Sequence, residues 1–204
     1  MGYMYYDAEF TQLQRNATFI SIGIKSSSGM SFYAEFNDYD HSQVNKWLLV
    51  NVISKLRYND VDNFINKVHC NPCPYSAYSI DMKGTAEEVR IQLLDWLQHE
   101  WAADEKNQLK FFVDCYAHDW VLLIDLLTDG QTSMEMPEFI HYIPIDLCGA
   151  LWARGYDPDI NRVQFVGWDT DQYNTSQHNA LYDAIIIQEC FNRLYNETNL
   201  NTPE

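Results

Sequence analysis

The sequence predicts an α/β protein with a mixed five-stranded sheet and helices on both of its faces. Three segments rich in β-branched and aromatic residues lie within residues 3–36, and strand-like segments then alternate with helical patterns. The composition agrees, because 204 residues with 47% hydrophobic content can bury one substantial core. We therefore expect a single domain over residues 1–196 and a polar C-terminal tail over residues 197–204.

The first half of the chain is expected to begin with an antiparallel meander. Residues 3–8 form its first strand, and residues 18–36 form two more that a Ser/Gly turn joins. Apolar residues within 42–56 recur at nearly helical spacing, which predicts a helix. Residues 58–84 are rich in Asn, Pro and Tyr and are interpreted as an irregular connection.

The second half predicts strands followed by helices. Thr85, with Glu88 three residues later, has the pattern of a capping box and begins a helix. Gly155 is expected to end a later one. The remaining strands and helices are expected, in order, at residues 109–117, 119–127, 139–147, 148–155 and 179–195.

Composition also narrows the class of protein. No charged-then-apolar leader and no apolar run of the roughly 18 residues that a membrane helix needs are visible, so we expect a soluble, cytoplasmic protein without membrane contact. The formal charge of −16 disfavours nonspecific binding to nucleic acid. An odd number of cysteines in apolar surroundings predicts reduced thiols: Cys70, Cys73, Cys115, Cys148 and Cys190.

Two acids stand in the first strand. Asp7 and Glu9 are one residue apart in "YYDAEF", so in a strand their side chains point to the same face, about 7 Å apart. Two carboxylates at that distance repel by roughly 2 kcal/mol at an effective dielectric of about 20. A half-buried strand that aims both at one place therefore needs a nearby positive charge.

Two further acids are expected to point inward. Asp119 begins an apolar helical stripe that follows a strand, and Asp183 shares a helix face with Ile187 and Cys190. His178 precedes Asp183 by five residues, so we place it on the loop or first turn, where its imidazole can take a proton from a bound water. The four carboxylates predict a site for two divalent cations, Mg²⁺ or Mn²⁺.

The order of these motifs resembles a known enzyme family. D-x-E on the first strand, an Asp after the fourth strand and H-x-x-x-x-D at the last helix are similar to the DEDDh 3′-to-5′ exonucleases of the ribonuclease H-like superfamily. Within it, "YYDAEFTQ", "FISIGI", "AHDWVLL", "IPIDLCGALWARG" and "HNALYDA" resemble the small bacterial exoribonucleases of the mycobacterial type. The likeness extends over residues 3–195.

The resemblance implies a role for each motif residue. Asp7, Glu9, Asp119 and Asp183 would be the metal ligands and His178 the general base, with Glu9 counted among the catalytic residues as well. The implied reaction is metal-dependent hydrolysis of the terminal phosphodiester of single-stranded RNA or a 3′ overhang, releasing a nucleoside 5′-monophosphate. The implied partner is a single-stranded 3′ end.

Other residues are candidates for substrate contact. Aromatic side chains can stack on the terminal nucleotide, and cations can contact its phosphates. Phe10 and Trp120 have core packing as their alternative interpretation. The candidates are Phe10, Trp120, Trp168, Tyr173, Arg154 and Arg162, with Arg15 and Lys25 as further cations to test.

Several alternatives stay open at the level of sequence. Asp114 competes with Asp119 as the ligand, and Asp146 is interpreted as a helix N-cap. Asp169 and Asp171 are interpreted as solvated loop acids. Cys70 and Cys73 form a C-x-x-C beside a His but have no matching second pair for zinc.

Function has alternatives as well. A DNA exonuclease acting on single strands, a non-catalytic binding protein of the same fold, and a glycosidase using two acids without metal are the competing hypotheses. A chain with 14 Tyr and 6 Trp has aromatic residues that suit an interface, so a homodimer is considered beside a monomer.

Overall fold

A mixed seven-stranded sheet forms the centre of the molecule in the computed structural model, with strand order β4-β5-β3-β2-β1-β6-β7. The structure describes residues 2–58, 65–70, 78–104, 107–114, 116–130, 135–169 and 177–200, with the backbone alone for 65–70 and 197–200. The strands are β1 Tyr3–Phe10, β2 Phe19–Ser26, β3 Ser31–Phe36, β4 Ile65–Cys70, β5 Tyr78–Gly84, β6 Lys110–Val113 and β7 Ile145–Asp146.

Helices connect and cover these strands. The α-helices are α1 Lys46–Asn51, α2 Ala86–Ala103, α3 Tyr116–Leu127, α4 Leu147–Ala153, α5 Arg162–Val166 and α7 Ala180–Leu200, and the short 3₁₀ turns are η1 His41–Gln43 and η2 Ile53–Lys55. Within the ranges above, no helix combines the length and the apolar character needed to cross a membrane.

The meander predicted for the start of the chain is confirmed. β1 pairs with β2 and β2 with β3, all antiparallel, and a turn containing Gly29 at φ +94° joins β2 to β3. β6 then pairs parallel to β1, and β7 parallel to β6. β6 lies beside Tyr3–Tyr6, the first half of β1, and α3 begins shortly after β6 ends. This pairing brings residues from distant parts of the chain together.

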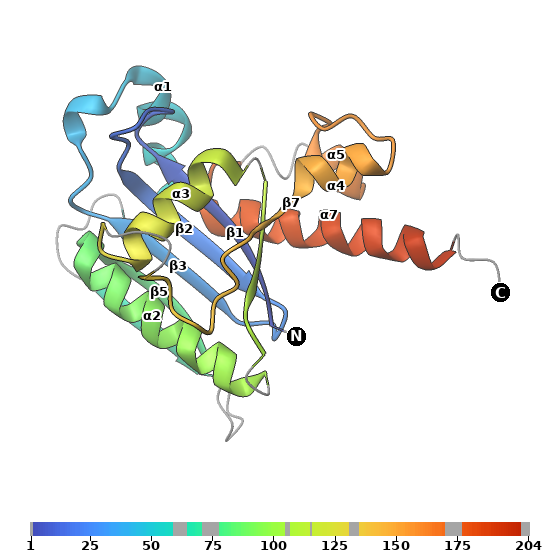
Figure 1. Ribbon diagram of the computed structural model, residues 1–204. Coiled ribbons are helices and arrows are strands. Elements are labelled where there is room, and N and C mark those ends of the chain that lie inside the picture. Colours follow the sequence, from blue (N-terminus) through green and yellow to red (C-terminus); the bar gives the residue numbers. More distant parts are fainter. Residues whose placement is uncertain are drawn as a thin grey trace.

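Helices lie on both faces of the sheet, as expected (Figure 1). On one face, α2 and α3 bury a core that includes Met4 and Tyr6 of β1. On the other, α7 packs with α4 and α5 over Tyr5, burying Ile187 and Cys190. Because side chains alternate along β1, the face that α7 covers also receives the side chains of the remaining odd-numbered residues of this strand.

Local signals set the helix boundaries where they are strong. Thr85 caps α2, its hydroxyl oxygen accepting the Glu88 N–H, while the Glu88 carboxylate accepts the Thr85 N–H in return. Asp146 caps α4 by accepting the Gly149 N–H at 2.6 Å, as its N-cap interpretation predicted. Cys148 and Cys190 are free thiols.

Residues 58–84 differ most from the prediction. The expected irregular connection contains β4 and β5, which form an antiparallel pair, and β5 adds to the sheet beside β3. The sheet therefore has seven strands instead of the expected five. The reason is tertiary: parallel pairing with β3 buries Ile80 and Met82, and nothing in the local composition signals that partner.

Other elements are shorter or longer than expected. The helix predicted within 42–56 is divided into η1, α1 and η2, because the Asn45 side chain accepts the Leu48 N–H and starts α1 there. The strand predicted at 139–147 is reduced to an isolated bridge at Ile140 and to β7. The short α5 was not predicted, and α7 continues past Asn196 to Leu200.

Candidate metal centre

Asp7 and Glu9 project from β1 toward α7, on the same face as Tyr5. The expectation that both acids share one face is thus confirmed, because Met4 and Tyr6 occupy the opposite core. The pairing register with β2 shifts between Glu9 and Phe10, so the strand is irregular just where its second acid stands. Such bulges bend a strand and redirect its side chains near functional sites.

Gly23 allows the start of α7 to lie directly against the sheet. It pairs with Asp7 across β1 and β2. A Cβ atom at position 23 would lie only 2.2 Å from the Leu181 nitrogen and 2.3 Å from the Ala180 carbonyl carbon. Any residue other than glycine would push the helix outward, so this position sets how closely Asp183 approaches Asp7.

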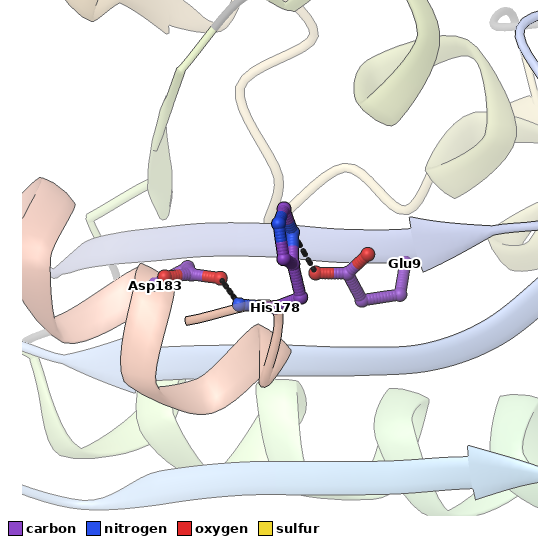
Figure 2. A group of neighbouring side chains, drawn as sticks. All are labelled: Glu9, His178 and Asp183. Atoms are coloured by element: carbon purple, nitrogen blue, oxygen red, sulfur yellow. Dashed lines mark hydrogen bonds and ion pairs between the residues drawn. The ribbon is translucent and has the colours of Figure 1, made fainter. Parts of the chain in front are cut away.

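His178 and Asp183 form a local unit at the start of α7. The His178 backbone has φ +65°, a conformation that residues with a Cβ rarely adopt. Its N–H donates to Asp183 Oδ2 at 3.0 Å, and its Nδ1 lies 3.7 Å from Glu9 Oε1 (Figure 2). His178 therefore precedes the helix and Asp183 occupies its first turn, as the sequence predicted.

Asp119 reaches the same place from α3. It lies in the first turn of that helix, is 8% exposed, and accepts a hydrogen bond from the Tyr6 hydroxyl through its backbone carbonyl at 3.3 Å. Among the described residues, the Asp119 Oδ1 atom is buried without a hydrogen-bond partner. A buried carboxylate oxygen in that state is costly unless a further group binds it.

One pocket of about 560 Å³ contains all five predicted residues. Ligand atoms of Glu9, His178 and Asp183 lie within 4.8 Å of one another, the spacing at which three groups can hold one metal ion. No Lys or Arg side chain is among the described residues that line this pocket. Its lining consists of Asp7, Ala8, Glu9, Phe10, Thr11, Gln12, Leu13, Asn45, Trp47, Leu48, Asp119, His178 and Asp183.

The acids shift one another's protonation. Burial, followed by repulsion from Asp183, Asp119 and Glu9, raises the pKa of Asp7 well above its ordinary value. Burial and the nearby Glu9 and Asp114 raise the pKa of Asp119 to about 8. The neighbouring Glu9 carboxylate raises the pKa of His178, against the opposing effect of burial.

This donor set fits a hard divalent cation. Carboxylate oxygens are the ligands that Mg²⁺ and Mn²⁺ prefer, and a histidine nitrogen is available beside them. A bound cation would satisfy the buried Asp119 oxygen and remove the repulsion that raises the carboxyl pKa values. Asp7, Glu9, Asp119 and Asp183 are the residues that would hold it.

Asp114, the competing ligand, has an internal partner. The Arg162 guanidinium donates to both of its carboxylate oxygens, at 2.7 and 2.9 Å. Arg162 also donates to the carbonyls of Ile160 and Pro158. The pair lines a second pocket of about 170 Å³, beside Asp7 and Asp183. The charge of Asp114 is therefore balanced within the protein, which favours Asp119 as the ligand.

The predicted substrate-contact residues lie in different surroundings. Phe10 lines the pocket and stacks on His118, with ring centres 6.0 Å apart. Trp120 is buried against Phe111 and donates to the Tyr142 carbonyl, so core packing, its alternative interpretation, is what the structure shows.

The remaining candidates are away from the lining of both pockets or outside the described residues. Trp168 is 38% exposed with its ring edge toward Tyr182, and Arg154 donates to the Leu194 carbonyl. Asp169 is exposed. Of the further cations, Lys25 donates to the Gly29 carbonyl in the β2–β3 turn. Tyr173, Asp171 and the side chains of Cys70 and Cys73, with the zinc alternative, lie outside what the structure describes.

Residues that the sequence did not single out also line the pocket. The Trp47 ring lies 5.1 Å from the His178 ring in an edge-to-face contact and is 53% exposed. Leu13, 75% exposed, lies on the loop after β1. Only the fold shows that Trp47 faces the pocket.

Comparison with known proteins adds no relative. Neither a set of protein-family models nor the curated proteins give a match to this chain. The arrangement of the site is therefore the evidence for function.

Proposed function

We propose that this protein is a divalent-metal-dependent 3′-to-5′ exonuclease with a ribonuclease H-like fold, acting on single-stranded RNA or 3′ overhangs. The observation that carries the proposal is the convergence of four carboxylates and a histidine from β1, α3 and the start of α7 in one pocket. The mixed sheet with helices on both faces agrees with the fold that the motifs resemble. Two divalent cations, Mg²⁺ or Mn²⁺, are the proposed cofactors.

With such cations bound, the centre would supply an activated water and stabilise charge on the departing 3′ oxygen. The protein's own groups set the geometry around them. Asp7 and Glu9 are fixed on a paired strand, and Asp183 is fixed by the helix that Gly23 admits. His178, which lies beside Glu9 in the pocket lining, would accept the proton of the attacking water.

The pocket also suits the end of a single strand better than a duplex. Its lining combines the acids with apolar and aromatic groups, including Phe10, Leu13 and Trp47. Aromatic faces stack on bases without sequence preference. Because the chain has a net charge of −16 and no Lys or Arg stands among the described lining residues, we expect it to bind through metal cations and stacking, and to bind phosphates weakly without metal.

The test uses 5′-labelled single-stranded RNA and DNA of one sequence, each also as a duplex with a 3′ overhang, with Mn²⁺, Mg²⁺ or EDTA. We expect a ladder that shortens from the 3′ end, requires metal and is lost in His178→Ala. His99→Ala, which removes an exposed histidine of α2, is the matched control and should keep full activity.

Each alternative has its own outcome. Faster shortening of DNA than of RNA would assign the DNA substrate. Hydrolysis of a glycoside substrate that continues in the presence of EDTA would support the glycosidase. Retention of the labelled strands on the protein without any shortening, under all metal conditions, would overturn catalysis and favour a binding protein.

A further inference from the structure

The segment formed by α1 and η2 contacts the His178 turn at two points. Lys55, the last residue of η2, donates from Nζ to the Gln177 carbonyl at 2.7 Å. Trp47 of α1 places its ring edge-to-face with the imidazole. Gln177 directly precedes His178, so one contact holds the backbone just before His178 and the other touches its imidazole.

The turn needs such support from outside α7. His178 has φ +65°, a backbone conformation that is sterically unfavourable for a residue with a Cβ atom and that costs conformational free energy. Its N–H is held by Asp183 on the C-terminal side. Lys55 supplies a bond on the N-terminal side, and it comes from a residue 122 positions away in the sequence. A charged donor makes this hydrogen bond stronger than a neutral one.

Lys55 is itself held in place by a buried carboxylate. Glu35 of β3 is fully buried and accepts the backbone N–H of Arg57 at 2.5 Å and of Tyr58 at 3.1 Å. The Tyr33 hydroxyl donates to the same carboxylate at 2.7 Å. These bonds fix the chain two and three residues after Lys55 to the central sheet. Glu35 is not part of the metal centre, and its buried carboxylate anchors the backbone that follows Lys55.

Apolar packing secures the other side of the segment. Val52 is fully buried and Ile53 nearly so, in a small cluster with Ile20 of β2 and Leu48 of α1. The backbone that carries Lys55 is therefore attached to β2 through this cluster and to β3 through Glu35. A side chain mounted in this way can transmit the position of the sheet to the turn before α7.

We propose that Lys55 is a positioning residue, which holds the His178 turn so that its imidazole faces Glu9 in the pocket. The inference rests on the proposed function for its catalytic consequence, whereas the order of the turn can be measured without any activity. Loss of the ammonium should free the Gln177 carbonyl, loosen the turn and misplace the base.

Lys55→Met is the test variant, because methionine keeps an unbranched side chain and removes the donor. Lys55→Arg should restore a charged donor. Lys46→Met removes an exposed lysine from the same segment and is the matched control for charge. Two quantities are measured: steady-state kinetics on the labelled strand, and hydrogen exchange of the His178 amide in protein without substrate or metal.

We expect Lys55→Met to lower kcat about tenfold with KM within about twofold, and to speed exchange of the His178 amide by a similar factor. Lys55→Arg should recover most of both, and Lys46→Met should change neither. A rise in KM at constant kcat would overturn the positioning role and indicate contact with substrate phosphates. Equal effects of Lys46→Met would also overturn the positioning role, because they would show that loss of any positive charge in this segment is enough.

The exchange measurement separates this inference from the proposed function. If the wild-type protein shows no nuclease activity, the proposed function fails, and faster exchange in Lys55→Met still supports the hold on the turn. If the protein is an active nuclease and exchange in Lys55→Met equals that of wild type, the positioning role is overturned while the function stands.

Discussion

Replacing Asp119 by asparagine probes the charge state of the acidic pocket directly. In the folded protein burial, with Glu9 and Asp114 nearby, raises the pKa of Asp119 from 3.8 to about 8. Between these two values the folded state holds a proton that the unfolded state has released. The contribution of Asp119 to the folding stability of the metal-free protein is therefore largest at the acid end of this window and falls as pH rises through it.

The magnitude follows from one proton. A single group of this kind changes the free energy of unfolding by at most about 1.4 kcal/mol per pH unit, or roughly 3 kcal/mol between pH 5 and 7. For a chain of this length that corresponds to roughly 5–10 °C in Tm. The amide side chain of the Asp119→Asn variant has no proton to lose, so the stability profile of this variant should be flatter by the same amount.

Urea denaturation in EDTA at pH 5, 6 and 7 measures the effect. Asp159→Asn, which removes an exposed carboxylate, is the control and should keep the wild-type slope. Adding Mn²⁺ at pH 7 should stabilise the wild type and affect Asp119→Asn much less. Parallel pH profiles for wild type and Asp119→Asn would refute the reasoning, because Asp119 would then be ionised in the folded protein throughout.

Three further outcomes are expected. Gly23→Ala should lose about 1–3 kcal/mol of stability, because its methyl group would meet the Leu181 backbone, and unchanged thermal denaturation would contradict the close approach. Arg162→Met should cost about 1–3 kcal/mol by leaving Asp114 unpaired, and a double-mutant cycle with Asp114→Asn should recover part of it; strict additivity would argue against the pair. Binding of Mn²⁺ at pH 7 should release protons from groups such as Asp119, so calorimetric heats should depend on the buffer; equal heats in buffers of different ionisation enthalpy would exclude that release.

Much of the candidate site could be predicted because its signals are local. Alternation along a strand is enough to place Asp7 and Glu9 on one face, and helical spacing is enough to turn Asp183 inward. The capping box at Thr85 marks the start of α2 in the sequence itself. These features depend on neighbours within a few residues, so they can be predicted from a single sequence.

Other residues have roles that only their distant partners define. Trp47 and Trp120 are both aromatic residues in helical patterns, yet Trp120 packs in the core and Trp47 borders the pocket. Arg162 looks like a free cation in sequence, and the fold pairs it with Asp114, 48 residues earlier. Lys55 has no motif around it, and its bond to Gln177 exists only because α7 returns to the sheet.

The sequence by itself therefore determined the α/β class, the meander and the composition of the acidic cluster, since these follow from local periodicity and from the chemistry of the side chains. The tertiary structure alone decided that β5 joins β3, that Gly23 admits α7 to the sheet, and which charges are balanced internally. The physical reason is that strand pairing, close backbone approach and ion pairing each depend on two segments together. The local sequence of one segment does not specify which other segment it will contact.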